Sequence, residues 1–186
     1  MELEKVILTR RTTRKFTDYV VTEEEINKIM ELARWTPSWA NTQSWEFVIM
    51  RDKEKMEKIA DLYSKNNAAI KCAKKASVLI IGCIKNRIAG YKKEETWTKF
   101  ENESWGMYDL GAAVQNISLE IHNLGLGSVI VGAMDHNKIK EIIKLPENYE
   151  VVVSLAVGKP FEIKKEGPRR KELKEFVYLD EFGKIR

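Results

Sequence analysis

The chain has 186 residues, of which 44% are hydrophobic, and its 32 basic and 28 acidic side chains leave a net charge of +4. This length suits a single domain with a substantial core, and the interspersed charges argue against the one-signed stripe of a nucleic-acid-binding protein. The longest apolar run, residues 78–84, is too short to cross a bilayer, and the first residues lack the apolar region of a signal peptide. Cys72 and Cys83 match neither a redox nor a zinc motif. We therefore expect a cytoplasmic protein with no membrane or nucleic-acid partner and no metal.

Two helices are expected at the start of the chain. Residues 2–10 form the first, and the second begins at a capping box made by Thr22 and Glu25. The acids at positions 23–25 fall in the first helical turn, where they stabilise the helix dipole, so we interpret them as structural rather than catalytic. The apolar positions of the two helices follow helical spacing and are Leu3, Val6 and Ile7, then Ile26, Ile29, Met30 and Ala33.

Strands and helices then alternate unevenly. Residues 45–50 alternate in polarity as a strand does, and Asp52 can cap a helix that follows. Residues 77–84 form a continuous β-branched run, which is typical of a strand buried on both faces. Residues 85–103 are polar without a clear period, as many lids and mobile loops are.

The longest helix is expected over residues 104–124, and Gly125 should end it. Residues 111–113, Gly-Ala-Ala, make a narrow waist on this helix, where another backbone could approach closely. The remaining elements are strands at 129–131 and 150–157, a helix that Asp135 caps and that runs to Leu145, and a short strand at 176–179. This order predicts an α+β fold with a mostly antiparallel central sheet flanked by helices.

Two clusters of side chains indicate a bound nucleotide-like cofactor. Guanidinium groups and hydroxyls at a helix end suit a phosphate, and the first cluster consists of Arg10, Arg11, Thr12 and Arg14. The second, residues 35–47, holds three tryptophans with an Asn and a Gln, whose side chains can both donate and accept at the edge of a heteroaromatic ring. The alternatives are a basic cluster placed for the helix dipole and a helix stop with buried tryptophans.

These motifs resemble the nitroreductase family of FMN-dependent oxidoreductases. The family's opening motif is matched by the arginine cluster, and its loop motif is matched by Pro37, Ser38, Asn41, Gln43, Trp45 and Phe47. Ser44 stands where the family usually has proline. Downstream matches are Asp109 to Ala113 with Asn116, Gly125 to Ser128, and a basic motif of Arg169, Arg170 and Lys171 with Leu173 and Glu175.

The resemblance implies a flavin site and an obligate homodimer. The FMN phosphate would be held by the arginine cluster together with Arg169 and Arg170. The loop residues Pro37, Ser38, Trp39, Asn41 and Gln43 would face the ring, partly from the other subunit. Backbone groups of Val131 and Gly132 would approach the flavin, and core packing is the alternative for Val131. The C-terminal strand would be exchanged within the dimer.

The implied activity is transfer of a hydride or electrons from NAD(P)H through FMN to a nitroaromatic, a quinone or a similar flat acceptor, by a ping-pong cycle. Trp39 and residues 85–103 would shape the cleft. The alternatives are reductive dehalogenation or other flavin chemistry, and a non-enzymatic flavin-binding regulator. The turn at Gly125 is no dinucleotide fingerprint, because Ile130 stands at the third glycine position. We interpret His122 and His136 as structural and expect no catalytic side chain, because the flavin carries the chemistry.

Overall fold

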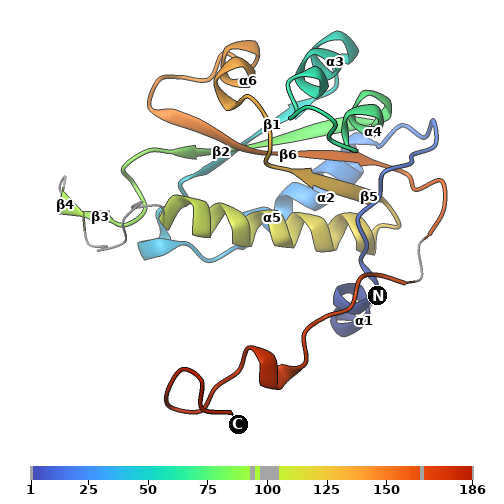
Figure 1. Cartoon of the computed structure of the whole chain (residues 1–186). Coiled ribbons are helices and arrows are strands. Elements are labelled where there is room, and N and C mark those ends of the chain that lie inside the picture. The colour runs from blue at the N-terminus through green and yellow to red at the C-terminus, as the bar shows by residue number, and fades with distance from the viewer. Residues whose placement is uncertain (1, 93–94, 97–104, 164–165, 186) are drawn as a thin grey trace.

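The computed structural model describes residues 2–92, 95–96, 105–163 and 166–185. Its centre is a four-stranded, fully antiparallel sheet in the order β1-β2-β6-β5, flanked by helices on both faces (Figure 1). The α+β architecture expected from the sequence is confirmed. The strands of this sheet are β1 (Trp45–Met50), β2 (Val78–Lys85), β5 (Gly127–Val131) and β6 (Tyr149–Gly158). The helices are α1 (Leu3–Thr9), α2 (Glu23–Arg34), α3 (Lys53–Asp61), α4 (Ile70–Lys75), α5 (Trp105–Asn123) and α6 (His136–Ile142).

Alternating side chains of the sheet pack into two hydrophobic cores, one on each face. The core under α2 and α5 receives Val78, Ile80 and Ile84 from β2, whereas the core under α3, α4 and α6 receives the intervening Leu79, Ile81 and Cys83. This two-sided burial explains why β2 reads as a continuous apolar run. A β-bulge in β6 opposite Gly82 and Cys83 shifts the register by one residue. The strand therefore changes which face its side chains present on the two sides of the bulge.

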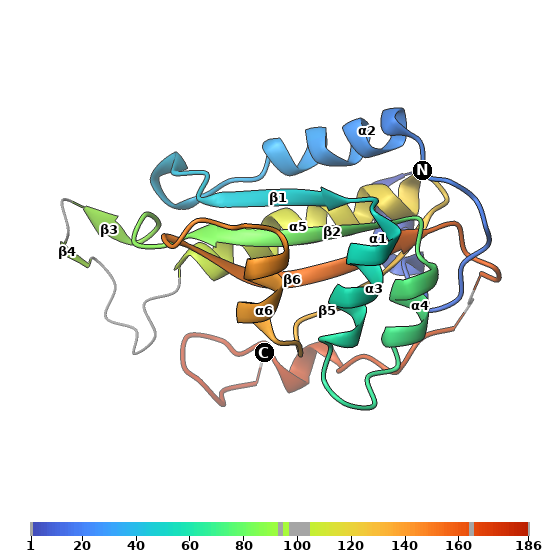
Figure 2. The ribbon, with the colours of Figure 1, turned by 90° about the horizontal axis from the view of Figure 1, so that it is seen from above.

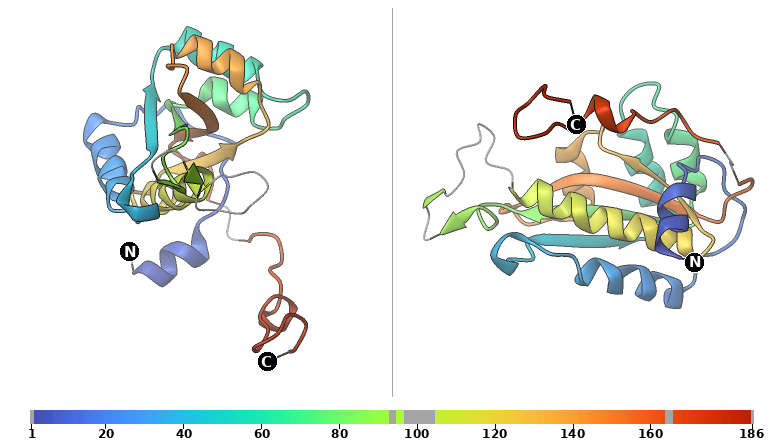
Figure 3. Two further views of the ribbon diagram at one scale, coloured as in Figure 1. Left: turned by 90° about the vertical axis from the view of Figure 1, so that its left-hand side faces the viewer. Right: turned by 90° about the horizontal axis from the view of Figure 1, so that it is seen from below.

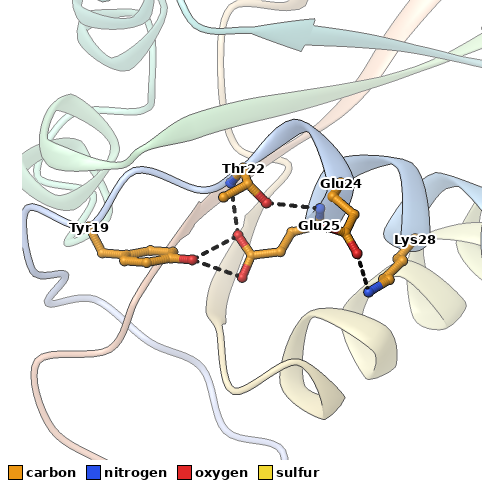
Figure 4. A network of polar contacts seen from close by, with 5 residues as sticks. All are labelled: Tyr19, Thr22, Glu24, Glu25 and Lys28. Carbon is orange, nitrogen blue, oxygen red and sulfur yellow. Dashed lines mark hydrogen bonds and ion pairs between the residues drawn. The ribbon is translucent and has the colours of Figure 1, made fainter.

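Local capping signals define several helix ends as the sequence predicts. Thr22 accepts from the Glu25 amide and Glu25 accepts from the Thr22 amide, so the capping box is confirmed. Figure 4 shows this box together with the Tyr19 hydroxyl, which donates to Glu25. Asp52 and Asp135 cap α3 and α6. Gly125 ends α5 with a positive φ of 72°, as glycine at this position commonly does.

Helix α5 lies close against the sheet because β2 carries a glycine beneath it. A Cβ on Gly82 would lie 2.8 Å from Val153 Cγ1 of the neighbouring strand β6 and 3.3 Å from Leu110 Cδ1 of α5, so a larger residue would displace the Val153 side chain and press on the helix. The expected waist behaves differently. Gly111 is exposed, and a Cβ placed there would meet nothing within 4 Å. Within the described chain, nothing approaches the waist closely at Gly111, whereas Ala113 is buried in the core under α2 and α5.

Three sequence-based expectations need correction. Of the predicted apolar face of α1, only Val6 is buried, while Leu3 and Ile7 are exposed. The helix that Asp135 caps ends at Ile142 and not at Leu145. Residues 176–179 form no strand: a 3-10 turn, Leu173–Glu175, precedes them, and Tyr178 makes an isolated bridge to Ile185. The segment lies away from the sheet (Figures 1 and 3), so it has no edge with which to pair.

The polar segment at 85–103 is described only in part. Tyr91–Lys92 (β3) and Glu95–Thr96 (β4) pair as a small antiparallel ribbon. Positions 93–94 and 97–104 lie outside the described residues. Within the described part of the chain, no helix has the length and apolar character needed to cross a membrane.

Candidate functional site

The segment that carries the arginine cluster is fixed to the beginning of β5. Thr12 forms a parallel bridge with Ser128, and the Thr13 amide donates to the Ser128 carbonyl over 2.9 Å. A Cβ on Gly127 would collide with the Thr13 side chain. Glycine at this position therefore lets the two backbones lie side by side.

The arginines of this cluster have different surroundings. The Arg11 guanidinium donates to the carbonyls of Leu8 and Arg10, at 2.7 and 2.9 Å, and so satisfies acceptors at the C-terminal end of α1. Its buried Nε has no hydrogen-bond partner among the described residues. Within the same described residues, Arg10 and Arg14 make no side-chain hydrogen bond or ion pair. These two guanidinium groups keep their donors available.

A cleft of about 200 Å³ lies beside the cluster. Its lining includes Arg11, Thr12, Arg14, Lys15 and His122. His122 Nε2 lies 2.8 Å from the Thr9 hydroxyl. Burial, and then the positive charges of Arg10 and Arg11, lower the pKa of His122 below its usual 6.5. The lining also includes Glu162, whose Oε1 lies 3.8 Å from Lys15 Nζ. The basic side chains of Arg11, Arg14 and Lys15 outnumber this carboxylate, and their excess positive charge favours an anion.

The C-terminal basic motif reaches the same end of the molecule. Gly167 packs on Arg11 so closely that a Cβ would lie 2.8 Å from Arg11 Nε. Arg169 and Arg170 follow two and three residues later and are exposed. Arg169 lies 3.8 Å from Glu175, and Arg170 donates to the Pro168 carbonyl over 2.8 Å. The structure thus brings the two basic motifs together, although more than 150 residues separate them in the sequence. We call this region the arginine end.

The predicted ring-facing loop forms a strained turn at the start of β1. Trp39–Asn41 is a short 3-10 turn, with Pro37, Asn41 and Gln43 exposed and Ser38 and Trp39 half-buried. Ala40, Asn41 and Gln43 have φ values of 44°, 55° and 47°, a region that residues other than glycine rarely occupy. The Gln43 amide donates to the Ser38 hydroxyl, and the Gln43 side chain donates to Asn41 Oδ1.

The loop and the arginine end lie at opposite ends of the same chain (Figure 2). Helix α5 provides the scale, because it contacts both. The carboxylate of Asp109 accepts from the Trp39 amide near one end of α5, and His122 meets Thr9 near the other. An α-helix rises about 1.5 Å per residue, so these thirteen residues separate the two contacts by about 20 Å. The predicted site residues of one chain do not form one site.

The two predicted residues at the end of β5 also differ. Val131 is buried in the core under α3, α4 and α6, as the core-packing alternative has it. Gly132 is exposed, and a Cβ there would meet nothing within 4 Å. It lines a second cleft of about 740 Å³ together with Gly111, Ile130 and His136, among others. The His136 Nδ1 lies 2.9 Å from the Val151 carbonyl, a contact that fixes the ring.

Comparison with known proteins identifies the family of this chain. The family model described as "Nitroreductase family" matches residues 7–159. The chain belongs to the nitroreductase family. A Bacillus subtilis protein named "FMN reductase (NAD(P)H)" is 28% identical over 178 residues, which cover 90% of this chain and 70% of that protein. The "Oxygen-insensitive NADPH nitroreductase" of Helicobacter pylori is 26% identical over 96% of this chain and 97% of its own length.

A solved structure has the same fold. The NADPH:FMN oxidoreductase of Vibrio harveyi, solved with NAD⁺, superimposes with a TM-score of 0.83 at 23% identity, over 99% of this chain and 79% of that chain. This nitroreductase-family chain departs from the usual loop motif at Ser44. The Ser44 hydroxyl is buried and has no hydrogen-bond partner among the described residues.

Sequence reasoning missed the role of two residues that it had noticed only as motif matches. Asp109 is 2% exposed and bonds the loop at Trp39, while the Asn116 side chain donates to the Thr36 hydroxyl over 2.8 Å. The available signal was an acidic residue within the apolar stretch of the longest helix. Charged residues are rarely buried without a partner, so Asp109 indicated a specific contact.

Proposed function

We propose that this chain is an NAD(P)H-dependent FMN oxidoreductase that acts as a homodimer. In each site, the arginine end of one chain and the Pro37–Gln43 loop of its partner hold one flavin. The observation that carries the proposal is the distance of about 20 Å along α5 between two halves that the family motif requires together. Membership of the family and the names of the relatives support NAD(P)H-dependent flavin oxidoreduction.

The residues present fit FMN in three ways. Among the described residues, the guanidinium donors of Arg10 and Arg14 have no partner, and a phosphate that carries nearly two negative charges needs such donors. Arg169 and Arg170 add charge at the same end. Gly132 leaves open space beside the end of β5, where a planar ring could lie against the backbone. We assign Arg11 a supporting part, because its guanidinium is already bonded to carbonyls of its own segment.

The exposed surface of the described chain favours a two-chain assembly. The C-terminal segment 166–185 projects from the body (Figure 3). Several of its large apolar side chains are exposed in the single chain. Leu173, Phe176 and Phe182 are 73%, 54% and 93% exposed. An apolar arm of this kind is unfavourable in water unless another surface covers it. We propose that it packs on the partner subunit, as an arm exchanged within the dimer.

The chemistry follows from what the protein groups can do. When bound, FMN supplies hydride acceptance from NAD(P)H and delivery of reducing equivalents to a second substrate. The chain's own residues bind and orient: the arginine end neutralises the phosphate, and the loop supplies amide groups toward the ring edge. His122 and His136 are tied to Thr9 and Val151, so we assign neither a proton transfer. A single cleft used in turn by reductant and flat acceptor gives ping-pong kinetics.

Absorption spectroscopy and an acceptor panel test the proposal. The purified or reconstituted protein should bind about one FMN per chain, and NADH or NADPH should be oxidised with a nitroaromatic or a quinone. Initial rates at several acceptor concentrations should give parallel double-reciprocal lines. Bound FMN with no turnover would favour a flavin-binding regulator, and halide release from a halogenated aromatic would favour dehalogenation. A protein that takes up no FMN on reconstitution would contradict the proposal.

A further inference from the structure

Helix α5 holds the Pro37–Gln43 loop through two polar side chains. Asp109 Oδ2 accepts the Trp39 amide at 3.0 Å, on the C-terminal side of Pro37. Asn116 Nδ2 donates to the Thr36 hydroxyl at 2.8 Å, on its N-terminal side. Positions 109 and 116 are seven residues apart, so they lie two turns apart on one helical face. The loop is therefore attached to α5 on both sides of its proline.

The conformation of the loop requires such attachment. Three residues other than glycine have φ between 44° and 55° within four positions, at Ala40, Asn41 and Gln43. Backbone of this kind persists only where surrounding contacts fix it. The contacts inside the loop join Gln43 to Ser38 and to Asn41, but they hold the loop only to itself. The ends of the loop are fixed by α2 and β1, where the Thr36 amide donates to the Ala33 carbonyl and the Ser44 carbonyl accepts from the Lys85 amide. Between these ends, the side-chain hydrogen bond that joins the strained turn to the body is the one to α5.

Burial of the Asp109 side chain is energetically unfavourable unless a specific contact compensates it. Only 2% of it is exposed, and a carboxylate in such a place is unfavourable unless a donor compensates it. Burial raises the pKa of Asp109, and the hydrogen bond from the Trp39 amide opposes that rise. A simple hydrophobic stripe would pack α5 as well, so core stability does not require an acid here. The hydrogen bond that the carboxylate accepts from the Trp39 amide explains why an acid is buried here.

We infer that Asp109, with Asn116 as the second anchor, is a positioning residue for the flavin site of the partner subunit. From α5 of one chain it sets where the Pro37–Gln43 loop stands against the flavin at the partner's arginine end. Asp109 touches no reacting atom and acts only through the loop. This inference rests on the proposed function for its flavin and its second chain.

Two variants and a matched control test the inference in the full-length dimer. Asp109→Ala removes the acceptor, whereas Asp109→Asn keeps an oxygen of the same shape. Ser118→Ala is the control, because Ser118 is a buried polar residue of the same helix whose hydroxyl, among the described residues, donates only to the Val114 carbonyl. The readouts are the dissociation constant for FMN added to apoprotein and the hydrogen-exchange rate of the Trp39 amide in apoprotein.

Asp109→Ala should weaken FMN binding by about tenfold or more, because a hydrogen bond to a charged acceptor is lost. The Trp39 amide of this variant should exchange much faster than in the native protein. Asp109→Asn should restore both values to within about threefold of native, and Ser118→Ala should leave both near native. An activity loss in Asp109→Ala should exceed what its flavin content explains.

The inference would be overturned if Asp109→Ala bound FMN as tightly as the native protein although its Trp39 amide exchanged faster. The proposed function would then still stand. Equal losses in the Ala and Asn variants would also overturn the inference, because the acceptor would then not be the determining feature. If the native protein itself bound no FMN, the proposed function would fail, and the inference would fail with it. Amide exchange would still report whether Asp109 holds the loop.

Discussion

Subunit mixing gives a direct test of a flavin site built from two chains. Arg10→Ala/Arg14→Ala damages the arginine end, and Asn41→Ala/Gln43→Ala damages the loop. If each flavin lies between the arginine end of one chain and the loop of the other, a heterodimer of these variants has one site with both defects. Its other site combines a native arginine end with a native loop. Two defective proteins should therefore restore one functional site.

The expected size of the effect follows from the site. Each lost charge-assisted bond to phosphate weakens binding by about 1.5–3 kcal/mol, so the double arginine variant should lose about 100-fold or more in FMN affinity. By symmetry, the purified heterodimer should then recover about half of the native flavin per chain and about half of the native turnover. If both halves of a site came from one chain, neither heterodimer site would be native, and recovery would be near zero.

Co-expression of the two variants with different affinity tags separates heterodimers from homodimers. Heterodimers are isolated by sequential purification, and FMN per chain is measured after release from the protein. NAD(P)H oxidation is measured with a saturating quinone. Each variant homodimer, carried through the same steps, provides the baseline. A verified heterodimer with no more flavin or activity than these homodimers would refute the two-chain site. Native FMN affinity in Arg10→Ala/Arg14→Ala would instead refute the role of these arginines in holding the phosphate.

Three further outcomes are expected. Arg10→Ala should weaken FMN binding about tenfold or more, with little change in the Tm of the apoprotein. Arg11→Ala should lower that Tm, because carbonyls at the end of α1 lose their donor. Equal effects of the two variants in FMN titration and in calorimetry would contradict the assignment of Arg10 to phosphate binding and of Arg11 to helix support. Tyr63→Phe should lower the free energy of unfolding in urea by about 1–2 kcal/mol, because it leaves the buried Ser154 hydroxyl without its partner at 2.8 Å, and FMN affinity should not change. The lowered pKa of His122 disfavours its protonated form in the folded protein. The contribution of neutral His122 to the free energy of unfolding should therefore be fully present above pH 6.5 and should decline as the pH falls toward the pKa in the folded protein. His122→Gln should flatten the plot of unfolding free energy against pH in this range, and an unchanged slope would show that another group causes the decline.

Local features of the fold could be predicted from the sequence because their causes are local. The capping box at Thr22, the caps at Asp52 and Asp135 and the helix end at Gly125 all depend on neighbours within a few residues. The unbroken apolar run of β2 determined that both faces of this strand are buried. The motifs likewise identified the nitroreductase family, because they are short and keep their order along the chain.

Only the tertiary structure decided how these parts combine. The sequence lists the arginine cluster and the loop motif about twenty-five residues apart, yet the two lie at opposite ends of α5. Residues 176–179 look like a strand in isolation but have no sheet edge beside them, and strand pairing depends on a partner from elsewhere in the chain. Arg11 matches the phosphate motif but bonds its own helix end. Motifs specify which side chains are available, and the distances that packing imposes determine which of them can act together.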